Sequence, residues 1–248
     1  MSLSGVRVGG WAVGWAGLRV CVCAVDPVDG TTNLAAGLPL VTCSIALARR
    51  GVVELGVVYD PCRSELFAAR RGRGATLNGQ RIGGGGGGGG PPSASLPAKP
   101  GRVPGQGAEA AAGSGDGIEA SAAPRKPAVA LRDVVFCVGF PPEPKAFAQQ
   151  VALLGGLGPK VRGVRSLASC ALACCWVGAG RLGAYVARDV NAWDFAAGAL
   201  VACESGGVAS DLSTGEPLRP RHRDLACSVE LTLHATILAA VAELEQPK

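Results

Sequence analysis

The sequence contains few histidines, few aromatic residues and no long apolar run. Its two histidines, His222 and His234, have no metal-ligand spacing, and no two of its ten cysteines form a C-x-x-C pair, so zinc is not expected. The longest apolar stretch, residues 167–180, is shorter than the roughly 20 residues that a helix needs to cross a bilayer. We therefore expect a core helix there and no membrane partner.

Basic residues exceed acidic ones, giving a formal net charge of +5, but the arginines are scattered and no aromatic residues alternate with them. This pattern predicts no nucleic-acid partner. The cysteines follow the apolar pattern, which is typical of buried free thiols in a reducing compartment. We expect a cytoplasmic protein. Import into a plastid or another organelle is the alternative, because Trp11, Val13 and Trp15, with Arg7 and Arg19, resemble a targeting segment.

The length of 248 residues suits one domain with its own core. Residues 83–130 interrupt it, beginning with eight consecutive glycines and continuing with Ala, Ser, Gly and Pro without periodicity. Such a composition cannot bury enough apolar surface to order itself, so we predict a disordered Gly/Ala/Pro-rich insertion. The insertion divides the domain into residues 18–82 and 131–248, and residues 1–17 are expected to form a poorly defined N-terminus.

Apolar periodicity predicts a strand at the start of the first part of the domain and a mixture of strands and helices in the second part. The first strand is expected at residues 20–25. Further strands are expected near residues 134–138, 161–165, 183–187, 207–210 and 224–229, and helices near 146–155, 166–180, 194–205 and 233–245. This mixture favours layered sheets with covering helices.

The most informative motif, residues 26–33, reads D-P-V-D-G-T-T-N and directly follows the first predicted strand. A proline between two carboxylates favours a rigid turn over a continuing strand, which is expected to end at Val25. Gly30 allows the backbone to approach a ligand closely, and Thr31 and Thr32 can cap a following helical turn. Because carboxylates suit hard divalent cations and free N–H groups suit phosphate, the motif predicts a site for Mg²⁺ and a phosphate.

The spacing of the two aspartates separates two classes of phosphatase. The aspartate-nucleophile phosphatases carry D-x-D-G-T, whereas here Pro27 and Val28 both intervene between Asp26 and Asp29. The motif instead resembles that of the inositol monophosphatase family of Mg²⁺-dependent, lithium-sensitive phosphatases. Further segments resemble this family in the same order, namely residues 37–39, 41–48, 54–61 and 72–80.

A second motif, residues 191–198, reads N-A-W-D-F-A-A-G. Asp194 is expected to open an apolar helix, where a carboxylate is favoured, and a helix cap is the simpler interpretation of a W-D pair alone. Because residues 204–208 then resemble the E-A-G-G turn of the family, we assign the motif to the family. The resemblance covers residues 18–82 and about 131–230.

The resemblance implies an α/β (α+β) sandwich of alternating helix and sheet layers, like that of inositol monophosphatase and fructose-1,6-bisphosphatase. It also implies two or three Mg²⁺ ions, a small phosphate ester as substrate and a homodimer. The position of Asp26 bridges two ions in that family. Asp29 and Asp194 complete the second metal site, and the carbonyl of Val28 reaches the first.

For the chemistry, the resemblance implies that the N–H groups of Gly30 and Thr31 bind the phosphate. The Thr31 hydroxyl would help to position the attacking water, which makes Thr31 and Asp26 the expected catalytic residues. The family also carries a Glu-Glu pair upstream, and no acidic residue precedes Asp26 here. We therefore expect an N-terminally truncated chain with one incomplete metal site and no general base for Thr31, a loss that typically costs about 10² to 10⁴ in rate.

The alternative to truncation is a catalytically impaired paralogue that acts as a partner subunit. In the family, long helices precede the Glu-Glu pair, and their loss would leave an apolar sheet surface uncovered. On either interpretation, the metal-binding aspartates are expected to form one divalent-cation site.

The substrate side departs from the family pattern in two places. Where the family has G-[ST]-A-A beside the alcohol, we match Arg165, Ser166, Leu167 and Ala168, which with Asp194 are the expected substrate contacts. Seven residues before Asp194, where inositol-cleaving members carry a Glu, stands Ala187, which cannot accept a hydrogen bond from a ring hydroxyl. Inositol monophosphate is the leading substrate. Histidinol phosphate, a sugar 1-phosphate and a 3′-phosphonucleotide are the alternatives.

Overall fold

The computed structural model describes residues 11–16, 19–83 and 128–245. Nearly all of the segment predicted to be a disordered insertion, and most of residues 1–17, lie outside these described residues. Among the described residues, no helix is long and apolar enough to cross a membrane.

The first part of the chain forms a seven-stranded antiparallel sheet whose strands neighbour one another in chain order. From the third strand onward each strand is joined to the next by a short turn, and the five-residue helix α1 (Thr31–Ala35) lies between the second and third strands. The strands are β1 (Trp11–Ala16), β2 (Arg19–Asp29), β3 (Thr42–Arg49), β4 (Val52–Asp60), β5 (Glu65–Arg70), β6 (Gly74–Leu77) and β7 (Gln80–Ile82).

The second part forms a five-stranded mixed sheet with the order β11-β12-β10-β8-β9. β8 is parallel to both β9 and β10, and β12 is antiparallel to β10 and β11. The strands are β8 (Val135–Val138), β9 (Gly163–Arg165), β10 (Ala184–Ala187), β11 (Val208–Ser210) and β12 (Leu225–Ser228). The helices of this part are α2 (Pro144–Leu157), α3 (Cys170–Gly178), α4 (Ala192–Glu204) and α5 (Leu231–Glu245).

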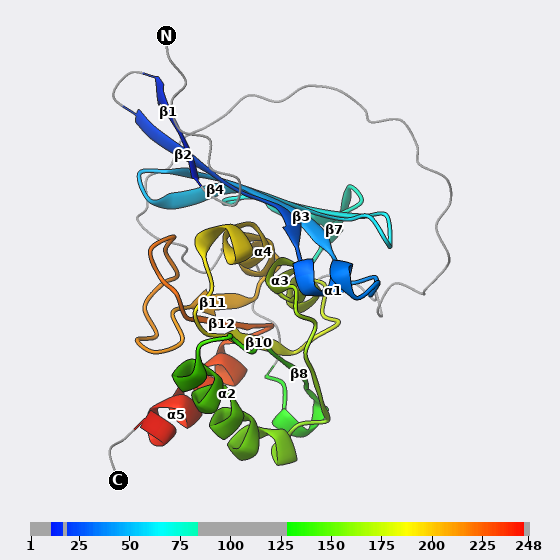
Figure 1. Ribbon diagram of the computed structural model, residues 1–248, viewed down its shortest axis with the longest axis vertical. Helices are drawn as coiled ribbons and strands as arrows, with labels where there is room; N and C mark the ends of the chain where they lie inside the picture. The colour runs from blue at the N-terminus through cyan, green and yellow to red at the C-terminus, as the bar shows by residue number, and fades with distance from the viewer. Residues whose placement is uncertain (1–10, 17–18, 84–127, 246–248) are drawn as a thin grey trace.

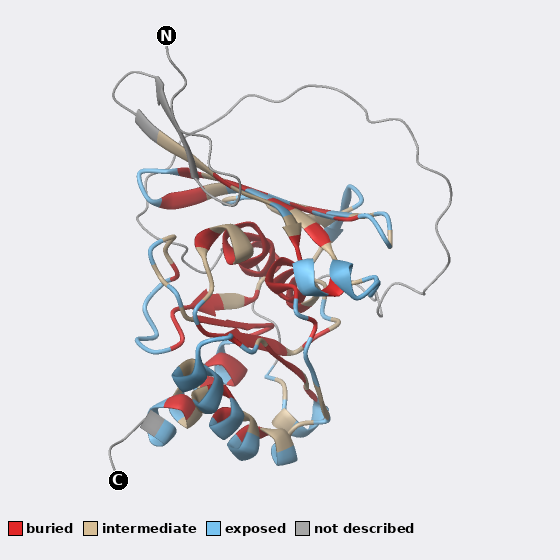
Figure 2. Ribbon diagram, in the orientation of Figure 1, coloured by how far each residue is buried: buried red, intermediate tan, exposed pale blue. Residues whose placement is uncertain are grey.

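These elements stack in layers (Figure 1). α3 and α4 lie between the two sheets, and α2 and α5 cover the far face of the five-stranded sheet. Figure 2 shows that the middle helices are almost entirely buried. Small residues permit the close packing, since a Cβ on Gly56 of β4 would lie 2.8 Å from the carbonyl oxygen of Ala197 in α4. The layered sandwich expected from the sequence is therefore confirmed.

The predicted helices and strands of the second part are all present, and apart from the start of α3 their boundaries lie within two residues of those predicted. The helix predicted at residues 166–180 begins only at Cys170, because Ser169 caps it by accepting a hydrogen bond from the N–H of Leu172. In the first part, β1 was not predicted. β2 does not end at Val25 as predicted but continues to Asp29, with a change of register between Asp26 and Asp29.

Candidate metal centre

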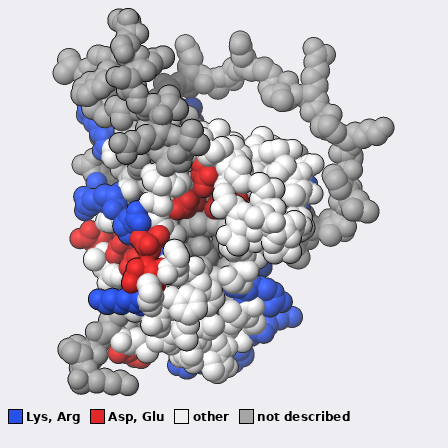
Figure 3. Space-filling model, in the orientation of Figure 1, with Lys and Arg blue, Asp and Glu red and all other residues white. Residues whose placement is uncertain are grey.

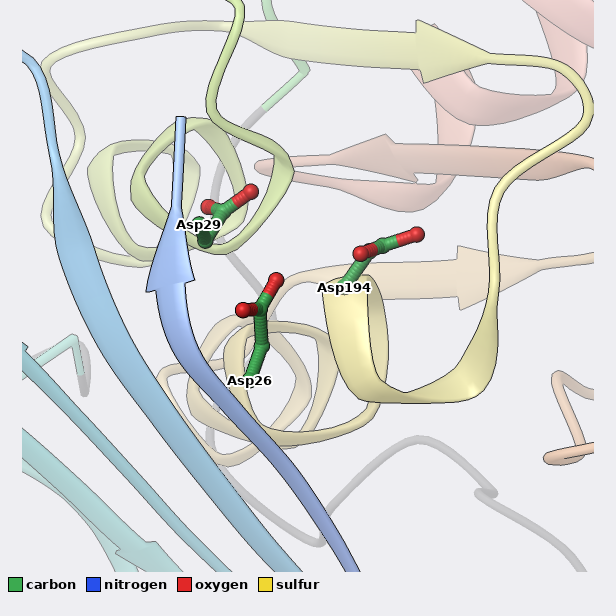
Figure 4. A group of neighbouring side chains, drawn as sticks. All are labelled: Asp26, Asp29 and Asp194. Carbon is green, nitrogen blue, oxygen red and sulfur yellow. The ribbon is translucent and has the colours of Figure 1, made fainter. Parts of the chain in front are cut away.

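Three aspartates from the two sequence motifs meet between the sheets. Asp26 and Asp29 come from the end of β2, and Asp194 comes from the first turn of α4, which packs against β2. Each side chain offers one carboxylate oxygen, and these three oxygens all lie within 4.8 Å of one another. Figure 4 shows the three carboxylates grouped between β2 and the start of α4.

A β-bulge brings Asp26 and Asp29 to the same face of the sheet. Side chains alternate between the two faces of a regular strand, so residues three positions apart would face opposite ways. Here Asp26 pairs with Ser44 and Asp29 pairs with Thr42. Between these two pairs β2 has one more residue than β3, which is a β-bulge. Ser44 and Thr42 are both buried, on the inner face of β3. The D-P-x-D spacing therefore requires the bulge if both carboxylates are to reach one ion.

Asp29 is buried and is held by groups from the start of α3. Ser169 Oγ donates to its Oδ2 at 2.5 Å, and the N–H of Ala171 donates to the same oxygen at 2.9 Å. The N–H of Cys170 and the hydroxyl of Thr42 lie farther away, at 3.3 Å. Burial raises the pKa of Asp29 to about 6, although the bonds from Ser169 and Ala171 lower it. The neighbouring Asp194 and Asp26 raise this pKa further by repulsion between like charges.

Asp194 does not open its helix, as the sequence suggested, but is the third residue of α4. The preceding Asn191 is the N-cap, and its backbone N–H donates to Asp194 Oδ2 at 2.7 Å. This is the bond that a capping box makes from its third helical residue back to the cap. Burial raises the pKa of Asp194, the N–H of Asn191 lowers it, and Asp26 raises it again. Asp194 is thus both a helix-capping residue and a member of the acidic cluster.

The donor set fits a hard divalent cation. Carboxylate oxygens are the ligands that Mg²⁺ prefers, and a carbonyl such as that of Val28, inside the bulge, is of the same kind. Burial raises the pKa of Asp26 above its usual range, while a hydrogen bond from the N–H of Val28 to Asp26 Oδ1 lowers it. A cation among the three carboxylates would replace their mutual repulsion by attraction.

The turn after the bulge is shaped by Gly30 and fixed by Asn33. Gly30 is the N-cap of α1 with a positive φ of 90°, and a Cβ there would lie 2.6 Å from the carbonyl oxygen of Leu40. No side-chain bond caps this helix, so the predicted cap by Thr31 or Thr32 is wrong, and both are exposed residues of its first turn. The buried Asn33 donates to Leu40 O at 2.8 Å and to Leu167 O at 2.7 Å, which ties the turn to the chain before α3.

The segment matched to the substrate side is placed differently from what the sequence suggested. Arg165 and Ser166 are exposed, and the Arg165 guanidinium donates to the carbonyl of Val164. The residue with the left-handed backbone that a glycine would favour is Ala168, with φ of 48°, and the hydroxyl that follows it is Ser169. A left-handed residue followed by a hydroxyl thus occurs at Ala168 and Ser169, three residues after the start of the segment matched from the sequence.

Four residues with clear contacts in the site were not singled out from the sequence: Thr42, Asn33, Ser169 and Asn191. A serine or asparagine directly before an apolar helical run is a helix-start signal, which could have identified Ser169 and Asn191. The contacts that Thr42 and Asn33 make depend on the pairing of strands and on a segment far away in the sequence. Ala187, at the end of β10, is buried, and its methyl side chain has no polar group that could bind a ligand.

The layered α/β sandwich with three carboxylates at the end of a bulged strand defines the structural class of this protein. The model of the inositol monophosphatase family matches residues 18–96 and 125–246, and the chain belongs to this family. It is 34% identical over 192 residues to "Nus factor SuhB" of Pasteurella multocida, an alignment that covers 77% of this chain and 57% of that protein. It is 32% identical over 195 residues to "Inositol-1-monophosphatase" of Mesorhizobium japonicum, covering 78% of this chain and 58% of that protein.

Solved structures agree with this membership. The IMPase of Thermotoga maritima superposes with a TM-score of 0.65 at 26% identity, covering 93% of this chain and 71% of that one. Inositol monophosphatase from Anabaena gives a TM-score of 0.68 at 25% identity, covering 89% and 73%. The chain thus spans little more than half the length of the curated relatives that it matches.

Proposed function

We propose that this protein is a Mg²⁺-dependent phosphomonoesterase that acts on a small polyol phosphate, with inositol monophosphate as the leading substrate. The observation that carries the proposal is the meeting of Asp26, Asp29 and Asp194, with oxygens within 4.8 Å of one another, at the end of a bulged strand. Membership of the inositol monophosphatase family supports the same chemistry.

In this proposal the three carboxylates hold a divalent cation and the Val28 carbonyl contributes to a neighbouring position. When bound, Mg²⁺ supplies Lewis-acid stabilisation of phosphoryl charge and lowers the pKa of a water ligand. The bulge and the contacts of Asp29 with Ser169 and Ala171 keep the carboxylates in place before the cation arrives. Little reorganisation is then needed on binding.

The phosphate is proposed to bind beside this centre, at the start of α1. The first N–H groups of a helix have no partner within the helix, so those of Gly30 and Thr31 are available to phosphate oxygens. The exposed Thr31 hydroxyl would orient the attacking water, next to Asp26. Asn33 keeps this turn against the segment before α3, so that phosphate and cation sites stay in register.

The alcohol part of the substrate is proposed to lie near the ends of β9 and β10, close to Arg165, Ser166 and Leu167 and to Asp194. The name of the Mesorhizobium relative favours inositol 1-phosphate. Ala187 provides no acceptor for a ring hydroxyl, which favours a broader choice of ester, including histidinol phosphate, a sugar 1-phosphate or a 3′-phosphonucleotide. A homodimer is proposed from the family resemblance alone.

A second candidate is a non-catalytic binding role in a larger assembly. Several relatives carry the name "Nus factor SuhB", which is not the name of a hydrolase. In this candidate the protein binds the cation but does not hydrolyse a phosphate ester. Phosphate release therefore separates the two candidates, whereas cation binding does not.

The decisive experiment measures Mn²⁺ or Mg²⁺ binding by calorimetry. We expect Asp194→Asn to weaken binding at least about tenfold, because a ligand charge is lost. The matched control is Asp133→Asn, an exposed aspartate next to Arg132 in the turn Leu131–Asp133 before β8, which should bind like the wild type. Equal binding by the wild type and Asp194→Asn would overturn the shared site.

Turnover is measured as phosphate release from the four esters named above, with and without Mg²⁺. We expect release that depends on Mg²⁺ and that falls by about 10² or more in Asp26→Asn. Cation binding without any phosphate release would favour the non-catalytic candidate.

A further inference from the structure

Asn191 connects the metal centre to a charged surface loop. Its backbone N–H donates to Asp194 Oδ2 at 2.7 Å, and its side-chain Nδ2 lies 3.4 Å from the same oxygen. The other end of the Asn191 side chain, Oδ1, accepts a hydrogen bond from Nη1 of Arg223. Asn191 thus lies between a carboxylate of the metal centre and a guanidinium outside it.

Arg223 holds the connection between β10 and α4 at three points. Its Nη1 donates to Asn191, its Nη2 lies 2.5 Å from Asp189 Oδ1, and its carbonyl accepts the N–H of Val190 at 2.8 Å. The loop between β11 and β12, to which Arg223 belongs, carries acidic and basic groups side by side (Figure 3). The adjacent Asp224 accepts the N–H of Asp189, which adds a further link to the same connection.

The guanidinium favours one orientation of the Asn191 amide, the same one that the capping box with Asp194 requires. An amide has an acceptor oxygen at one end and a donor NH₂ at the other, whereas arginine can only donate. With Arg223 at Oδ1, the NH₂ end must face Asp194, where it meets an acceptor of negative charge. Without Arg223 the amide could rotate by 180° and direct its oxygen at the carboxylate, which repels it.

We propose that Arg223 is a positioning residue for the cation site: through Asn191 it fixes the Asp194 carboxylate, with Oδ2 turned to the helix N-cap. The inference rests on the proposed function, because it gives Asp194 the role of a cation ligand. Partners that orient a ligating side chain commonly change metal affinity by 10- to 100-fold when they are removed. Arg223 acts through a neutral asparagine, so we expect about three- to tenfold.

The test compares Mn²⁺ affinity in the wild type, Arg223→Gln and Arg223→Lys. We expect Arg223→Gln to bind about three- to tenfold more weakly. Arg223→Lys should recover part of the loss, since lysine keeps the charge and can donate to Asn191 but has one nitrogen in place of the two that Arg223 uses. The matched control is Arg221→Gln, two residues earlier in the same loop, whose exposed ion pair with Glu216 is 3.7 Å long. Unchanged affinity in Arg223→Gln would overturn the proposal.

A double-mutant cycle distinguishes action of Arg223 through Asn191 from a direct electrostatic effect of its guanidinium on the cation site. If Arg223 acts through Asn191, Arg223→Gln should have no further effect on Mn²⁺ affinity in an Asn191→Ala background. Additive losses would instead show that the guanidinium acts on the site directly, and would overturn the proposal. The Arg223 and Arg221 variants should unfold within about 2 °C of the wild type, because exposed ion pairs contribute little stability. Asn191→Ala also removes the N-cap of α4 and should unfold at a lower temperature, so its affinity is compared only with that of the double variant.

A metal-free readout distinguishes the failure of this inference from the failure of the proposed function. In the apo protein, the Asn191 backbone N–H and side-chain NH₂ should exchange with solvent more slowly in the wild type than in Arg223→Gln, as measured by NMR. If the wild type binds no Mn²⁺ but this difference is present, the cation site is refuted and the Arg223–Asn191–Asp194 clamp is retained. If Mn²⁺ binds and the exchange rates are equal, the clamp is refuted alone.

Discussion

The two sheets differ in how many of their faces are covered. The five-stranded sheet lies between α3 and α4 on one side and α2 and α5 on the other, and every residue of β10 and β12 is buried. The seven-stranded sheet is covered by α3 and α4 on one face only, among the described residues, and burial alternates along β3 and β4. The same kind of apolar strand thus occurs in two different surroundings.

The uncovered face of the seven-stranded sheet is nevertheless apolar. Ile45 is opposite Val57, and Tyr59 is opposite Leu66, so these side chains form one patch across β3, β4 and β5. Each of them is between 36% and 45% exposed. An antiparallel sheet with one solvated face usually alternates apolar and polar residues, and this one does not. Contiguous apolar surface of this kind is uncommon on a protein in water and favours association.

The largest expected effect is a loss of stability, compared between neighbouring residues on opposite faces of one strand. Phe67 on the inner face of β5 is fully buried, and Leu66 on the outer face is 41% exposed. We expect Phe67→Ala to lower the free energy of unfolding by about 3–5 kcal/mol and Leu66→Ala by about 1 kcal/mol or less. In β10, the neighbours Tyr185 and Val186 are both buried, so each change to alanine should cost about 2 kcal/mol or more.

Urea denaturation of the four variants measures these differences. A cost for Leu66→Ala as large as that for Phe67→Ala would mean that the outer face is covered in solution. The comparison between the two sheets would then not hold.

The second-largest expected effect is a loss of folding stability at low pH, and it arises where α5 packs on the five-stranded sheet. His234 of α5 is buried, and its two ring nitrogens each lie 2.8 Å from a serine hydroxyl, that of Ser210 in β11 and that of Ser228 in β12. Burial lowers the pKa of His234 to about 4. Because the folded pKa lies below the unfolded value, the unfolded chain binds the proton first as the pH falls.

The stability contributed by His234 is therefore complete above about pH 6.5 and is lost as the pH falls towards 4, a change of about 3 kcal/mol. Urea midpoints measured from pH 7 to 4 should fall more steeply for the wild type than for His234→Gln. His222→Gln is the control, since His222 lies in the loop between β11 and β12 and accepts a bond from the N–H of Arg219. The same steepness in His234→Gln and the wild type would contradict the prediction.

The smallest expected change in stability concerns Ala168, in the segment before α3 to which Asn33 of the first part is hydrogen-bonded. Ala168 has a positive φ, which is unfavourable for a residue with a Cβ, and it directly precedes the Ser169 that binds Asp29. We expect Ala168→Gly to raise the free energy of unfolding by up to about 1 kcal/mol. The same exchange at Ala179, the C-cap of α3 with φ of −76°, should instead cost about 0.5–1 kcal/mol. A melting-temperature shift of the same sign in both variants would contradict this account.

Much of the fold could be predicted because its elements depend on local pattern. The apolar runs of α2, α4 and α5 have helical spacing and clear ends, and the strands of the second part are short apolar runs between turns. The position of the left-handed residue before α3 could not be predicted, for a reason that is also local. The left-handed position is occupied by Ala168 rather than by the glycine that would have marked it.

The members of the candidate metal centre could be named from the sequence alone, because the residue types and spacings around Asp26, Asp29 and Asp194 resemble one family pattern. How the three carboxylates meet depends on strand pairing and helix packing. The bulge that turns Asp26 and Asp29 to one face is a property of the pairing of β2 with β3, and a strand pattern read alone predicts opposite faces. The bond from Ser169 to Asp29 joins residues 140 positions apart, which no local pattern encodes. The exposure of Ile45 and Tyr59 likewise depends on packing. An apolar strand has the same sequence pattern whether one of its faces is covered or both.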